Sequence, residues 1–116
     1  MELSTELSPS QARQAMISAL LAVSDRLTPD VRSALNLAAS TNDSCANERA
    51  RVSLWQSLGG HAMGATHNVL CTRLAICTLY PNASVADTKD TIEYFVNTYR
   101  LCKLPEGVLA RAFAAG

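Results

Sequence analysis

The sequence predicts an all-α protein, a single-domain bundle of five or six helices around a central apolar helix. Apolar residues recur at spacings of three and four along most of the chain. The β-branched and aromatic runs that mark strands are missing, and alanine is abundant, which suits close helix packing. The 116 residues fit one domain, 1–116, in which we expect residues 1–8 to form a flexible arm.

The first half of the chain contains two sequence signals for the start of a helix. Ser8-Pro9 places a capping serine before a proline at the first helical position, and an apolar stripe follows as far as Leu27. Thr28-Pro29 repeats the signal for a second helix that runs to about Ala39. Residues 40–46 are mostly Ser, Thr, Asn and Asp, which is typical of a loop.

A third helix is expected from about Asn47 to Leu58, and the glycine pair 59–60 should break it. The fourth helix, about His61 to Tyr80, is apolar on every face, so we expect it to be the central one. Only Arg73 is formally charged between residues 53 and 81. The histidines and other polar groups of this stretch nevertheless argue against a transmembrane helix.

The last two helices follow from similar local signals. Ser84 caps the fifth helix, and Asp87 three residues later resembles a capping box. The segment 103–105, Lys-Leu-Pro, ends that helix. Residues 106–115 can form a short final helix.

Charge and composition narrow the function classes. Ten basic and ten acidic residues give a formal net charge of zero, which argues against a general nucleic-acid binder. The balance favours a protein partner, a small ligand or a second copy of the chain. Eight arginines against two lysines, together with the alanine content, indicate a GC-rich bacterial source. The acidic N-terminus shows no signal-peptide pattern, so we expect a cytoplasmic protein with reduced cysteines and no cofactor.

His67 and Cys71 are the clearest candidate ligands. They lie four residues apart on one predicted helix, a spacing that suits two metal ligands. Further zinc ligands could come only through the fold, from Cys45, His61, Cys77 or Cys102. Because buried cysteine is common without any function, we interpret the pair as core packing and keep metal binding as the alternative.

Cysteine chemistry offers two further hypotheses. A Cys71 thiol activated by His67 could act as a nucleophile, but burial in apolar surroundings should raise its pKa and make it inert. Cys45 and Cys102 lie near predicted helix ends, so they form the more plausible disulfide pair in an oxidising compartment.

Arg49, Arg51 and Trp55 are the best candidates for an interaction surface. Arginine and tryptophan are enriched at binding hot spots, and residues 51 and 55 share a helix face. A single tryptophan, the only one in this chain, is also frequently part of a core.

Three function classes remain from the sequence. We expect a protein that acts by protein–protein contact, as an inhibitor, an immunity protein or a chaperone-like regulator, with homo-oligomerisation possible. The alternative is a metal- or small-ligand-binding bundle that uses the His67 and Cys71 face. The third is an enzyme built from His61, His67 and Cys71, which we disfavour because no third orienting group is visible.

Overall fold

The computed structural model describes residues 7–40, 44–58, 66–79 and 84–114, and the regular secondary structure within these ranges is all helical. Its elements in chain order are α1 (Pro9–Ala22), the short 3-10 helix η1 (Ser24–Arg26), α2 (Pro29–Ser40), α3 (Ser44–Ser57), α4 (His67–Thr78), α5 (Val85–Leu101) and α6 (Glu106–Ala114). The prediction of an all-α bundle is confirmed. No helix in the described ranges has the length and apolar character needed to cross a bilayer.

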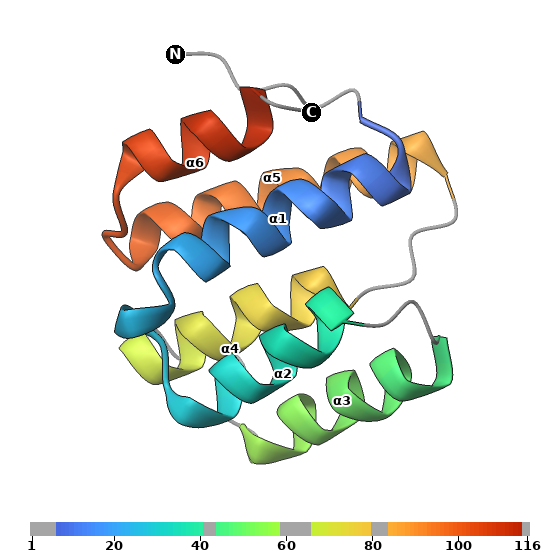
Figure 1. Ribbon diagram of the computed structural model, residues 1–116, viewed down its shortest axis with the longest axis vertical. Coiled ribbons are helices and arrows are strands. Elements are labelled where there is room, and N and C mark those ends of the chain that lie inside the picture. The colour runs from blue at the N-terminus through green and yellow to red at the C-terminus, as the bar shows by residue number, and fades with distance from the viewer. Residues whose placement is uncertain (1–6, 41–43, 59–65, 80–83, 115–116) are drawn as a thin grey trace.

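The helices pack around α1 and α4 (Figure 1). α1 contacts α2, α4, α5 and α6, and α4 contacts α1, α2, α3 and α5. α3 packs against α2 and α4, whereas α6 packs against α1 at the other side of the molecule. α3 therefore has a large outward surface.

The predicted central helix is confirmed as α4. All of its residues from Val69 to the C-cap Leu79 are buried except Arg73. The neighbouring core is built partly from aromatic rings, since Phe95 lies 6.1 Å from Tyr99 and 6.2 Å from Phe113, centroid to centroid. Burial of such rings contributes much of the apolar area that stabilises a domain of this size.

Three predicted helix starts are confirmed. The Ser8 side chain accepts a hydrogen bond from the backbone N–H of Gln11, and the Gln11 side chain accepts one from the backbone N–H of Ser8. Thr28 and Ser84 accept hydrogen bonds from backbone N–H groups three residues on. Each cap satisfies donors that a helix cannot satisfy itself.

The expected boundaries need four corrections. Leu7 is buried and Ser8 caps α1, so the last two residues of the expected arm belong to the folded part of the chain. α1 ends at Ala22 and η1 follows, although the apolar stripe stays buried as far as Leu27. α3 begins at Ser44, inside the expected loop, because residues 44–46 are only weakly unfavourable in a helix.

The fourth correction concerns the start of the central helix. α4 begins at His67, with Thr66 as its cap, rather than near residue 61. A threonine before a run of helix-forming residues is a helix-start signal. The apolar pattern continues on both sides of this threonine, so the pattern alone does not mark the start. The expected break at the glycine pair 59–60 and the candidate His61 lie outside the described residues.

Candidate functional site

The N-terminal half of α4 positions two of the predicted ligands. The backbone N–H of Val69 donates to the Thr66 side chain, which fixes the start of the helix. His67 occupies the first turn and is exposed, and Cys71 lies one turn later and is fully buried. Because residues four apart share a face of a helix, both side chains point toward the same place.

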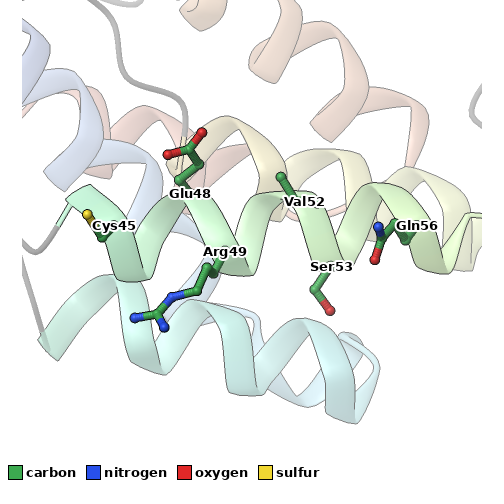
Figure 2. A pocket seen from close by; sticks show the side chains of 6 residues that line it. All are labelled: Cys45, Glu48, Arg49, Val52, Ser53 and Gln56. Carbon is green, nitrogen blue, oxygen red and sulfur yellow. The ribbon is translucent and has the colours of Figure 1, made fainter.

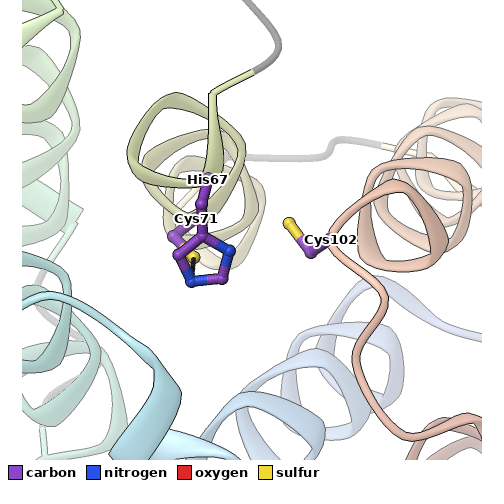
Figure 3. Close-up of side chains that lie close together, drawn as sticks. All are labelled: His67, Cys71 and Cys102. Atoms are coloured by element: carbon purple, nitrogen blue, oxygen red, sulfur yellow. Dashed lines mark hydrogen bonds between the residues drawn. The ribbon is translucent and has the colours of Figure 1, made fainter.

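The third member of the cluster comes from the C-terminal end of α5. Cys102 is the C-cap of this helix, where its backbone N–H donates to the carbonyl of Thr98. The next residue, Lys103, has φ of 57°, so the chain turns sharply away from the helix axis. α5 packs against α4, and Cys102 is thereby brought beside His67 and Cys71 (Figure 3).

The ligand atoms of His67, Cys71 and Cys102 all lie within 4.8 Å of one another. The Nε2 atom of His67 lies 3.4 Å from Sγ of Cys71 and 2.9 Å from the carbonyl oxygen of Arg26. A carbonyl oxygen can only accept, so Nε2 carries the proton in this arrangement. The Nε2–H group donates to Arg26 and faces a Cys71 sulfur that can act as a second acceptor.

The two thiols have different acidities. The hydrogen bond with Cys102, opposed by burial and assisted by the charge on His67, lowers the pKa of Cys71 to about 7. The same hydrogen bond raises the pKa of Cys102, and burial raises it further. The interaction therefore favours the thiolate form of Cys71 and the thiol form of Cys102.

This acidity corrects the expectation that burial makes Cys71 inert. Burial does raise its pKa, but the thiol donor Cys102 outweighs that effect. The expected behaviour is found instead at Cys77, where burial raises the pKa to about 12. Since the thiolate is the form that binds metals, Cys71 is the sulfur best prepared for this role.

Three of the four possible additional ligands, all except His61, lie in the described residues, and the fold places them in different surroundings. Cys102 joins the predicted pair, and the fold places it with Cys71 rather than with Cys45, its expected disulfide partner. Cys45 is exposed on α3, and Cys77 is buried in α4. Proximity of Cys102 to the pair depends on how α4 and α5 pack, and no local sequence signal reports that packing.

The predicted interface residues all lie on α3, but in different surroundings. Arg49 is exposed and lines a shallow surface hollow (Figure 2), whereas Trp55 is 42% exposed outside it. Arg51 is half-buried. The hollow is formed by side chains of α3 alone, namely Cys45, Glu48, Arg49, Val52, Ser53 and Gln56.

No family model, no curated protein and no solved structure matches this chain. Function is therefore inferred from the geometry and chemistry of the described residues.

Proposed function

We propose that this protein binds a thiophilic transition-metal ion, Zn²⁺ foremost, through His67, Cys71 and Cys102. The observation that carries the proposal is the convergence of one imidazole and two sulfur ligand atoms within 4.8 Å of one another. Imidazole and thiolate are the ligands that Zn²⁺ prefers. The proposal replaces our interpretation of His67 and Cys71 as core packing.

The spacing of the ligand atoms supports the proposal. Metal–sulfur bonds of about 2.3 Å and metal–nitrogen bonds of about 2.0 Å at tetrahedral angles separate sulfur from nitrogen by about 3.5 Å. The observed distance from Sγ of Cys71 to Nε2 of His67 is 3.4 Å. The pair therefore needs only small side-chain movements to bind one ion.

The charge balance also favours Zn²⁺. Two thiolates and a neutral imidazole give a charge of minus two, which Zn²⁺ neutralises, and a neutral centre costs less to bury beside the fully buried Cys71. The ion would replace the Nε2 proton of His67 and release the carbonyl of Arg26 from its hydrogen bond. That carbonyl oxygen or a water molecule would supply a fourth ligand.

A non-catalytic role and a cytoplasmic location are part of the proposal. A reducing compartment keeps Cys71 and Cys102 as thiols, which metal binding requires. The bound ion would link α4 to the end of α5, and through Arg26 it also lies next to η1.

Calorimetric titration with Zn²⁺, under reducing conditions, tests the proposal. We expect one ion per chain in the wild-type protein and at least about tenfold weaker binding in H67A, C71A and C102A, since loss of a ligand weakens a metal site. Cys45→Ser is the matched control, because Cys45 is exposed on a different helix. Unchanged binding in C71A and C102A would contradict the proposal.

Protein–protein contact is the second candidate function, in the sense of an inhibitor, an immunity protein or a chaperone-like regulator. The observation that favours it is the outward surface of α3, where Val52 and Trp55 are each 42% exposed. Exposed apolar side chains on one element mark interaction surfaces more often than isolated ones do. Co-purification from the source cell with wild-type protein and with Trp55→Ala tests it. A stoichiometric partner that is lost in the variant is the expected result.

A further inference from the structure

The outer face of α3 has a charge pattern that does not depend on the metal centre. Its buried side chains, Leu54 and Leu58, face the bundle. On a helix with 3.6 residues per turn, Cys45 lies about 180° from Leu54, and Val52 is rotated by only about 20° from Cys45. Leu58 lies about 140° from Cys45. Cys45 and Val52 therefore lie close to the midline of the outward face.

An acidic and a basic side chain flank this midline on opposite sides. Relative to Cys45, Glu48 is rotated by about 60° to one side and Arg49 by about 40° to the other. Figure 2 shows the same arrangement, with Glu48 and Arg49 pointing to opposite edges of the helix. Both residues line the surface hollow and are exposed.

We propose that this face binds the same face of a second copy of the chain, with the two α3 helices parallel. When a two-fold axis runs along two parallel helices, the acidic edge of one helix faces the basic edge of the other. Glu48 then pairs with Arg49 of the second copy, and the symmetry repeats the pair. Cys45 and Val52 meet their counterparts on the axis.

The charges favour a second copy of the chain as the partner, and they favour parallel α3 helices. An antiparallel pair would place the two acidic edges together and the two basic edges together, so both ion pairs would be lost. The charges on the outer face are complementary to those on the same face of a second copy, as a symmetric interface requires. A net charge of zero adds little repulsion between copies.

Sedimentation equilibrium of three samples tests the charge pairing. We expect the wild-type protein to show a monomer–dimer equilibrium. Glu48→Arg or Arg49→Glu alone should raise the dissociation constant about tenfold, because each change turns two attractive pairs into repulsive ones. An equimolar mixture of the two variants should dimerise about as well as the wild type, because every pair in the mixed dimer is again attractive.

Chemical cross-linking tests whether the two α3 helices of the dimer are parallel. A short bis-maleimide should link two wild-type copies through Cys45, since a parallel pair places these thiols together, and Cys45→Ser should abolish the link. A wild-type protein that remains monomeric would overturn the proposal and leave this face to a different protein. Failure of the mixed variants to dimerise, or no Cys45 link in a dimer, would also overturn it. None of these results depends on whether the protein binds metal.

Discussion

Sγ of Cys102 and Sγ of Cys71 lie within 4.8 Å of each other across the junction between the end of α5 and the first half of α4. Their interaction lowers the pKa of Cys71 and raises the pKa of Cys102. His67 lies against the thiolate side, with Nε2 at 3.4 Å from Sγ of Cys71. A metal ion bound here would displace protons from the nitrogen and sulfur ligand atoms of the cluster.

The first prediction concerns the acidity of Cys71. In metal-free protein, the ultraviolet absorbance of the thiolate should rise with a midpoint near the Cys71 pKa of about 7. Cys102→Ala removes the main hydrogen-bond donor, so the midpoint should move up toward the ordinary value of 9.0. Cys77→Ala is the control and should not change this titration, because the pKa of Cys77 is about 12. Titration of the wild-type protein and of C102A with the same midpoint would contradict the assignment.

The second prediction is that Zn²⁺ stabilises the folded protein. A ligand present at about 100 times its dissociation constant contributes about 2.7 kcal/mol to the free energy of unfolding. For a chain of this size, that amount raises the Tm by about 10 °C. Thermal unfolding followed by circular dichroism should show the increase in wild-type protein and in C45S. In C71A and C102A the increase should be small, and an equal increase in all four proteins would count against a site at this cluster.

The third prediction concerns Arg13, whose side chain crosses the bundle. Its Nε–H donates to the carbonyl of Thr78 at 3.0 Å, and one terminal nitrogen donates to the carbonyl of Ala38 at 2.8 Å. These carbonyls lie in the last turns of α4 and α2, where helices leave acceptors unsatisfied. Arg13→Met should therefore lower the free energy of unfolding by about 2–4 kcal/mol, measured by urea denaturation.

Arg32→Met is the matched control for this change. Arg32 is an exposed arginine on α2, and its replacement should change the free energy of unfolding by less than about 0.5 kcal/mol. Equal effects of the two substitutions would show that the Arg13 hydrogen bonds do not stabilise the fold.

The fourth prediction is a loss of stability in alkaline solution that depends on Tyr99. Its hydroxyl donates to the carbonyl of Pro105 at 2.7 Å, and burial foremost raises its pKa from 10.0 to about 12. The neutral form is favoured in the fold, so its contribution is complete below pH 10.0 and is lost as the pH rises toward 12. Tyr99→Phe should cost about 1 kcal/mol at neutral pH and reduce the alkaline loss. Urea denaturation across this pH range would contradict the account if both proteins lost stability equally.

Local signals made much of the fold predictable. The caps Ser8, Thr28 and Ser84 were recognisable because a cap depends on residues within one turn of it. The central position of α4 was recognisable because a helix that is apolar on every face must be buried. α3 starts earlier than the sequence predicts, since residues 44–46 resemble a loop although they are helical.

The candidate site was only partly predictable. His67 and Cys71 share one helix, so their spacing was informative. Cys102 reaches them only through the packing of α5 against α4, and its effect on the Cys71 pKa opposes the effect of burial. The role of Arg13 is not predictable from the sequence for the same reason, because its acceptors lie on α2 and α4.

X-ray absorption spectroscopy at the zinc edge, on protein loaded with one equivalent of Zn²⁺, tests the central claim most directly. We expect two sulfur ligands at about 2.3 Å and the remaining nitrogen or oxygen ligands at about 2.0–2.1 Å. One sulfur should disappear in C102A. A shell of nitrogen and oxygen alone, or a spectrum that is identical in C102A, would contradict a metal centre formed by His67, Cys71 and Cys102.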